Sequence, residues 1–160
     1  MPELPEVETV RNSLKEIILN QKITFISINY HKIIKNVTDQ EFIKALQGQT
    51  ILDIGRHGKY LIFSLSDYYL ISHLRMEGKY LIKTSEEVSK HEHIIFGFEK
   101  FNMRYHDTRK FGTMHLYHKD VDIYTALPLL NVGYEPFDER LTVTYLDNIF
   151  KRLNKPIKST

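Results

Sequence analysis

The stretch YLIFSLSDYYLISHL, residues 60–74, decides the fold. It contains two runs rich in Leu, Ile, Phe and Tyr, residue types that favour β-strands, and Ser66 and Asp67 separate the runs. Similar short runs, bounded by Gly, Ser, Asp or Asn, recur on both sides. The eight strand-like runs are 22–34, 51–54, 60–65, 69–74, 79–82, 94–99, 103–106 and 113–118. This pattern predicts a mainly β, α+β fold, a two-sheet β-sandwich of about eight strands with flanking helices.

Two helices are expected before the third strand-like run. Residues 5–19 carry apolar residues at helical spacing, and Pro5 suits the first turn of a helix. A shorter helix is predicted from Thr38, with Glu41 three residues later as a capping box and Gly48 as a stop. The sequence therefore predicts an N-terminal helix and a short second helix beside the sandwich.

The end of the chain returns to helical spacing. The apolar residues that show it are Val143, Leu146, Ile149, Phe150 and Leu153, followed by a basic segment. Such a helix at the end of the chain looks like a connector. We therefore assign residues 1–140 to a β-sandwich domain and residues 141–160 to a connector helix that leads into a further domain.

Composition excludes several classes of protein. A chain of 160 residues with 42% hydrophobic residues can bury a core, and no window reaches the length of about 18 apolar residues that a membrane span needs. The N-terminus does not resemble a signal peptide, so we expect a soluble cytoplasmic protein. With no cysteine, disulfides, thiol catalysis and thiolate zinc sites are excluded, and the net charge of +2 is too small to identify a partner.

The N-terminal sequence MPELPEVET suggests a reaction centre. Removal of Met1 would expose the secondary amine of Pro2, whose pKa lies about two units below that of a lysine side chain. Such an amine attacks an aldehyde-level carbon to give an iminium, and Glu3 beside it could transfer protons. If Met1 stays, Pro2 is an amide and cannot attack. Alternatively, Pro2 and Pro5 only stiffen the entry to a helix.

Three further positions have a functional and a structural interpretation. Lys59, in a glycine-flanked basic loop, suits a phosphate contact, and it equally suits an ordinary hairpin with a solvated lysine. Met76 and Phe111 could be core residues. However, each lies next to a glycine at an expected turn, where a bulky apolar side chain has little core to enter.

Two histidine pairs could in principle act as metal ligands. His91 and His93 form one pair, and His115 and His118 form the other. Neither pair has an evident third ligand, so the sequence predicts no metal site in this chain.

These motifs also carry a resemblance to a known family. The run PELPEVETVR, residues 2–11, closely resembles the start of the formamidopyrimidine-DNA glycosylase (Fpg) family, and Leu4 favours its purine-lesion branch over the endonuclease VIII branch. Segments 55–61, 72–78 and 107–112 resemble later family motifs in the same order, with His57 and Thr108 as departures. Residues 133–136 and 155–158 resemble two more. The resemblance implies a bifunctional DNA glycosylase and AP lyase that removes 8-oxoguanine and formamidopyrimidines in base excision repair.

The resemblance also implies roles for individual residues. Pro2 would be the Schiff-base nucleophile, Glu3 the proton carrier, Lys59 a helper in β-elimination, and Glu6 a support for this geometry. Arg109 would pair with the cytosine left opposite the extruded base. The residues expected to contact DNA are His73, Met76, His91, Arg109 and Phe111.

Family members continue beyond the matched region into a helix-two-turn-helix domain and a four-cysteine zinc finger. We therefore expect an N-terminal fragment with no cofactor of its own, weak or inactive alone, with zinc only in the missing C-terminal domain. Its expected partner is damaged double-stranded DNA, without a membrane, and we expect a monomer at the bacterial nucleoid. The alternatives are a non-catalytic nucleic-acid-binding β-sandwich and an unrelated interaction domain.

Overall fold

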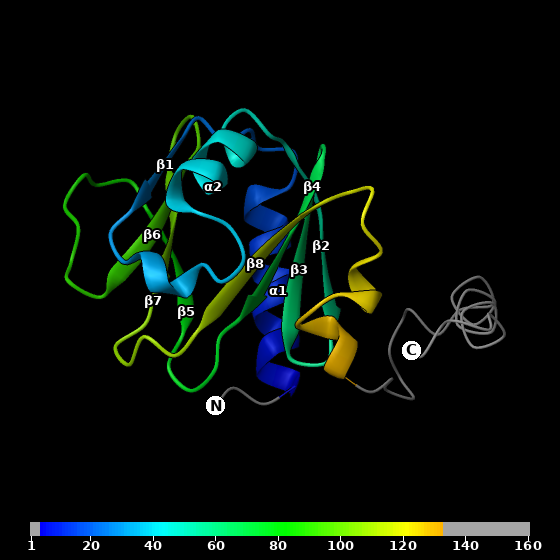
Figure 1. Cartoon of the computed structure of the whole chain (residues 1–160). Helices are drawn as coiled ribbons and strands as arrows, with labels where there is room; N and C mark the ends of the chain where they lie inside the picture. The colour runs from blue at the N-terminus through cyan, green and yellow to red at the C-terminus, as the bar shows by residue number, and fades with distance from the viewer. Residues whose placement is uncertain (1–3, 133–160) are drawn as a thin grey trace, which may run out of the picture.

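Eight strands form two antiparallel sheets in the computed structural model, which describes residues 4–132 (Figure 1). The first sheet has the order β1-β6-β7-β5, with β1 Phe25–Ile28, β6 Glu92–Gly97, β7 Asn102–His106 and β5 Lys79–Lys83. The second sheet has the order β2-β3-β4-β8, with β2 Ile51–His57, β3 Tyr60–Leu65, β4 Tyr68–His73 and β8 Thr113–His118. The predicted eight-stranded, two-sheet fold is confirmed.

The core lies between the two sheets and draws on alternate residues of the strands. Leu61 and Phe63 of β3 are buried in the same cluster as Phe96 of β6 and Tyr105 of β7. The residues between them on β3 and β4 face the other way: Ile62 packs with two short 3-10 helices, η2 Ile123–Thr125 and η3 Leu129–Asn131. The β2-β3-β4-β8 sheet is therefore covered on both faces, which explains why its strands carry long apolar runs.

The first helix, α1 Leu4–Ile18, confirms the predicted N-terminal helix. Val7, Leu14 and Ile18 are its buried residues and belong to the main core cluster. The helix packs along β2 and β3, and Lys15 Nζ lies 3.0 Å from Asp53 Oδ1 on β2. This packing places α1 against the β2–β3 hairpin.

The second helix, α2 Asp39–Leu46, has the predicted capping box. The Glu41 N–H donates to Thr38 Oγ1 at 3.1 Å, and the Thr38 N–H donates to Glu41 Oε1 at 2.8 Å. Gly48 follows with a φ of +91°, a conformation that favours glycine. The helix therefore begins and ends where local sequence signals predicted.

Several strand boundaries differ from the prediction by one or two residues, and two runs differ by more. The run 22–34 yields only the short strand β1 and a 3-10 helix, η1 His31–Ile33. After β1 ends, the N–H groups of Asn29 and Tyr30 share the His93 carbonyl, and the Asn29 side-chain amide donates to the Glu92 carbonyl at 3.1 Å. The predicted run 51–54 extends to His57, because the backbone from Gly55 onward pairs with β3. The connector predicted at 141–160 lies outside the described residues. Within residues 4–132, no helix is long and apolar enough to cross a membrane.

Candidate functional site

Lys59 lies in a two-residue turn that joins β2 to β3. His57 pairs with Tyr60 across the hairpin, and Gly58 has a φ of +60°, as the first central position of such turns often requires. Arg56 Nη1 donates to the Gly58 carbonyl at 2.9 Å and so braces the turn from its own strand. The functional and the hairpin interpretations of Lys59 are thus compatible, since the half-buried lysine stands on a fixed hairpin.

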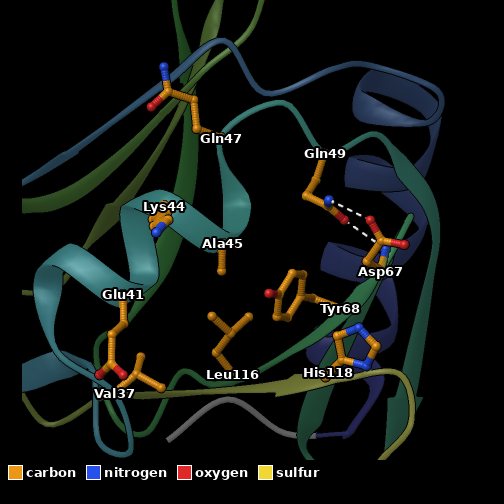
Figure 2. Close-up of a pocket in the computed structure, with 10 residues that line it drawn as sticks. All are labelled: Val37, Glu41, Lys44, Ala45, Gln47, Gln49, Asp67, Tyr68, Leu116 and His118. Atoms are coloured by element: carbon orange, nitrogen blue, oxygen red, sulfur yellow. Dashed lines mark hydrogen bonds between the residues drawn. The ribbon is translucent and has the colours of Figure 1, made fainter.

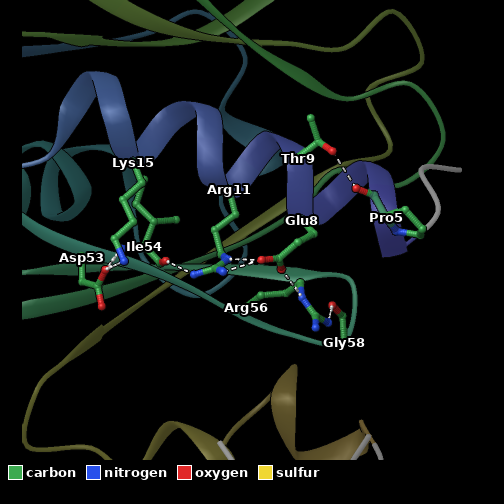
Figure 3. A network of polar contacts seen from close by, with 9 residues as sticks. All are labelled: Pro5, Glu8, Thr9, Arg11, Lys15, Asp53, Ile54, Arg56 and Gly58. Carbon is green, nitrogen blue, oxygen red and sulfur yellow. Dashed lines mark hydrogen bonds and ion pairs between the residues drawn. The ribbon is translucent and has the colours of Figure 1, made fainter. Parts of the chain in front are cut away.

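An ion-pair network ties this turn to the start of α1 (Figure 3). Glu8 Oε1 accepts from Arg56 Nε at 2.8 Å, and Glu8 Oε2 accepts from Arg11 Nε at 3.1 Å. Arg11 Nη1 also reaches the Ile54 carbonyl at 3.3 Å. Hydrogen bonds from Arg11 and then Arg56 hold the pKa of Glu8 below its usual value. Glu6 is exposed in the first turn of α1, two residues before Glu8.

His73 ends β4 opposite Tyr60, with the two ring centroids 4.5 Å apart. Burial, together with the positive charges of Arg75 and Lys59, lowers the pKa of His73 to about 4. Its Nδ1 accepts the Arg75 N–H at 2.9 Å, so the proton of the neutral ring resides on Nε2. Lys59 and His73 are therefore neighbours, and His73 is a neutral hydrogen-bond donor at ordinary pH.

Met76 and Phe111 lie at the tips of two loops that face the same end of the sandwich. Met76 is 50% exposed in the β4–β5 loop, and Phe111 is 53% exposed in the β7–β8 loop. Glu77 connects the loops, because its Oε1 accepts from Thr108 Oγ1 at 3.0 Å and its Oε2 lies 4.0 Å from Arg109 Nε. The prediction that Met76 and Phe111 avoid the core is confirmed.

Beneath these loops lies Asp107, which is fully buried. Its Oδ2 accepts from Tyr105 Oη at 2.9 Å and from the Gly112 N–H at 2.8 Å, while its Oδ1 accepts from the Arg109 N–H at 3.1 Å. The carboxylate thus binds both halves of the loop that presents Arg109 and Phe111.

His91 joins this region through its backbone. Its carbonyl accepts the Asp107 N–H at 3.0 Å, and its ring lies 5.7 Å from that of His106. The next residue, Glu92, is buried and bonds to Arg104 Nη1 at 2.7 Å and to Lys83 Nζ. Burial alone would raise the pKa of Glu92, but these two cations lower it to about 2. Arg104 also donates to the carbonyls of Ser85 and Glu87, so it anchors the loop that leads to His91.

The histidine pairs do not gather as metal ligands. His93 Nε2 already bonds to the Asp107 carbonyl at 2.6 Å, and His115 and His118 lie three residues apart on β8, which directs them to opposite faces. Across residues 4–132, no cluster of three or more potential ligands is found. Because the chain has no cysteine, a four-cysteine zinc finger cannot form within it.

A groove of about 620 Å³ lies elsewhere, between α2 and the strands β4 and β8 (Figure 2). Gln49 and Asp67 close one end of it through hydrogen bonds of 3.0 and 2.7 Å. No residue predicted for the site lines this groove. The groove therefore lies apart from the predicted site residues.

The structure brings most of the predicted site together. Lys59 and His73 are neighbours, the Met76 loop and the Arg109–Phe111 loop are joined, and His91 contacts their base. Pro2 and Glu3 lie outside the described residues. Sequence reasoning missed Tyr105, Glu77 and the role of Asp107. The one available signal was the position of Asp107 at the start of the DTRKFG motif.

Comparison with known proteins gives a consistent result. The family profile described as Formamidopyrimidine-DNA glycosylase N-terminal domain matches residues 1–114. The chain is 48% identical to the formamidopyrimidine-DNA glycosylase of Shouchella clausii and 47% identical to that of Bacillus licheniformis, in alignments 162 positions long that cover 99% of this chain. It spans only 58% of the length of these relatives.

Similar solved structures come from the same family. The Lactococcus lactis Fpg in complex with DNA containing an abasic site superposes with a TM-score of 0.71 at 45% identity, covering 74% of this chain and 45% of that one. Another complex of the Lactococcus lactis enzyme, with DNA containing Fapy-dG, gives a TM-score of 0.70 at 46% identity, with the same coverage.

Proposed function

The chain belongs to the formamidopyrimidine-DNA glycosylase family, and from this we propose that it acts in base excision repair on damaged double-stranded DNA. The reaction is that of a bifunctional DNA glycosylase and AP lyase for oxidised purines, 8-oxoguanine and formamidopyrimidine. The observation that carries the proposal is the pair of joined loops that expose Met76, Arg109 and Phe111.

These three side chains suit an enzyme that extrudes a base. The vacated space in the duplex favours closure of the stack unless side chains fill it. Met76 and Phe111 are large, apolar and exposed at turns, and the Arg109 guanidinium lies between solvent and Glu77. We assign the filling of the space to Met76 and Phe111, and pairing with the opposite cytosine to Arg109.

The remaining residues suit contacts with the sugar and phosphates. His73 is a neutral donor through Nε2, and Lys59 beside it is a cation on a rigid hairpin. Together they offer two hydrogen-bond donors to phosphate oxygens, and we assign a further phosphate contact to His91.

The proposed chemistry starts at the N-terminus. With Met1 removed, the Pro2 nitrogen forms a bond to C1′ of the extruded nucleotide as the bond from C1′ to the oxidised base breaks. The proton of the Pro2 nitrogen passes to the departing base, and Glu3 then protonates O4′ as the C1′–O4′ bond breaks and the sugar opens; Glu6 supports this arrangement. The resulting iminium permits β-elimination with help from Lys59 and then δ-elimination, which leaves a gap of one nucleotide. Residues 1–140 would form this catalytic domain and 141–160 the connector, in a monomer acting at the bacterial nucleoid.

Borohydride trapping on DNA with an abasic site tests the proposal. Mass spectrometry first establishes that Met1 is absent, and the protein is then reduced with DNA at low salt. We expect a covalent adduct, a weak adduct for Pro2→Gly, whose primary amine still forms an imine, and none after N-terminal acetylation. An unblocked protein that binds the DNA without an adduct would instead be a non-catalytic binding module, and the catalytic proposal would be wrong.

A further inference from the structure

A buried pair, Tyr105 and Asp107, lies beneath both exposed loops. We propose that these two are positioning residues that set Arg109 and Phe111 at a fixed distance from Met76 and thereby set selectivity for the base opposite the lesion. The selectivity part rests on the proposed function, whereas the positioning part concerns the free protein.

Asp107 is held from both sides. Its own N–H donates to the His91 carbonyl at 3.0 Å, and its carbonyl bonds to His93 Nε2 at 2.6 Å. Its carboxylate accepts the N–H groups of Arg109 and Gly112, one near each end of the loop. Hydrogen bonds to a buried charged group are stronger than those between neutral groups. The loop backbone is thus fixed to the first sheet by one side chain.

Tyr105 connects the Met76 loop to Asp107. A Cβ atom added to Gly78 would lie 2.4 Å from Tyr105 Oη, and one added to Gly112 would lie 1.5 Å from it. The hydroxyl therefore occupies the space between the end of the Met76 loop and the end of the Phe111 loop. Burial raises the pKa of Tyr105 strongly, so its hydroxyl stays protonated and donates to Asp107.

The exposed contacts between the loops do not replace this pair. Arg109 and Glu77 are 55% and 45% exposed, and their charged atoms are 4.0 Å apart. Exposed ion pairs of this kind hold side chains weakly because water and salt screen them. Tyr105 and Asp107 lie out of solvent, so the separation of the loops depends on them.

The test compares two variants with a matched control. Asp107→Asn replaces the acceptor carboxylate with an amide that cannot accept from all three donors, and Tyr105→Phe removes only the shared hydroxyl. Tyr80→Phe is the control, since its ring lies 5.4 Å from that of Tyr105 but its hydroxyl bonds to Ser72 Oγ at 2.6 Å. The wild-type protein and the three variants are titrated with duplexes that carry a tetrahydrofuran abasic analogue opposite cytosine or adenine.

Selectivity is measured as the dissociation constant for the duplex with adenine divided by that for the duplex with cytosine. We expect Asp107→Asn to lower the ratio about tenfold, the equivalent of about 1.4 kcal/mol, and Tyr105→Phe to lower it less. Tyr80→Phe should keep the wild-type ratio. A purely structural role would lower the melting temperature and leave the ratio unchanged in the folded protein.

Amide hydrogen exchange in the free protein provides the second measurement. The Gly112 and Arg109 N–H groups should exchange faster in Asp107→Asn and Tyr105→Phe, and at the wild-type rate in Tyr80→Phe. Unchanged exchange would overturn the positioning part of the proposal, and an unchanged ratio would overturn the selectivity part. If Asp107→Asn does not fold, the Tyr105→Phe and Tyr80→Phe pair decides by the same two measurements.

Failure of the proposed function would look different. A wild-type protein with no preference for the abasic analogue over undamaged duplex would contradict the repair function and the selectivity derived from it. Amide exchange would then still support or overturn the positioning role, because it requires no DNA.

Discussion

Glu92 and Asp107 are two buried carboxylates on neighbouring segments. The side-chain partners of Glu92 are positively charged, whereas the partners of the Asp107 carboxylate are neutral hydrogen-bond donors. Glu92 faces two cations, Arg104 and Lys83, within the first sheet. Asp107 faces neutral donors, the Tyr105 hydroxyl and two backbone N–H groups of the loop it begins. The first carboxylate closes a structural ion pair, while the second determines the shape of an exposed loop. Burial of a charge therefore does not by itself mark a functional site, because the partners decide its role.

The largest effect should follow from breaking the ion pair at Glu92. Arg104→Met leaves a buried carboxylate without its guanidinium, which should lower the free energy of unfolding by about 3–5 kcal/mol. Urea denaturation measures this. Lys83→Met is the control, since Lys83 is 37% exposed and its loss should cost about 1 kcal/mol or less. A similar loss in both variants would contradict the distinction between the buried and the exposed cation.

Acid should weaken the same pair. Because the pKa of Glu92 is about 2 when folded against 4.5 as its ordinary value, the unfolded chain binds more protons between these pH values. The stabilisation is complete above pH 4.5 and is lost as the pH falls through about 2. One such group changes stability by at most about 1.4 kcal/mol per pH unit. Urea midpoints measured across this range should show a smaller slope in Glu92→Gln, and an equal slope would contradict the assignment.

The Asp107 side of the comparison predicts a smaller cost in stability. Asp107→Asn leaves one buried donor unsatisfied, so the free energy of unfolding should fall by about 1–3 kcal/mol, less than for Arg104→Met. The opposite-base selectivity should follow the reverse order and change only in Asp107→Asn. If Arg104→Met also lost selectivity at a temperature where it is folded, the claim that only Asp107 affects selectivity would be wrong.

The smallest effect on stability should come from a loop tip. Phe111→Ala should change the free energy of unfolding by no more than about 0.5 kcal/mol, because the ring is already half exposed. Affinity for an abasic duplex should nevertheless fall at least about fivefold, since stacking on a base contributes about 1–3 kcal/mol.

Leu127→Ala provides the matched control, with the same 53% exposure at a position outside the two loops. It should change neither stability nor DNA affinity, as measured by urea denaturation and by fluorescence titration. Equal losses of affinity in the two variants would show that Phe111 has no specific contact with DNA.

Local signals predicted the fold well, and they failed where distant residues decide. The capping box at Thr38 and the runs of strand-favouring residues in β3 and β4 depend on near neighbours, so the sequence reveals them. Just beyond β1, Asn29 bonds to Glu92, 63 residues away, and no local pattern predicts such a contact.

In the candidate site, too, the sequence indicates some residues and not those whose role depends on distant contacts. The family resemblance suggested roles for exposed residues such as Arg109, because the motifs contain them. In the sequence Glu92 only separates His91 from His93, and its pairing with Arg104 appears in the structure alone. Tyr105 carries no sequence signal at all, since its importance depends on two glycines in separate loops.

The space around the Tyr105 hydroxyl has a practical consequence for altering the protein. Gly78 and Gly112 leave no room for even a methyl group there, so the bases of both loops tolerate little variation. The tips at 76, 109 and 111 are open to solvent and tolerate exchange. A combinatorial library confined to those three positions, with the two glycines, Tyr105 and Asp107 retained, should yield mostly folded proteins and so sample new preferences for the base opposite the lesion, while the loop bases stay unchanged.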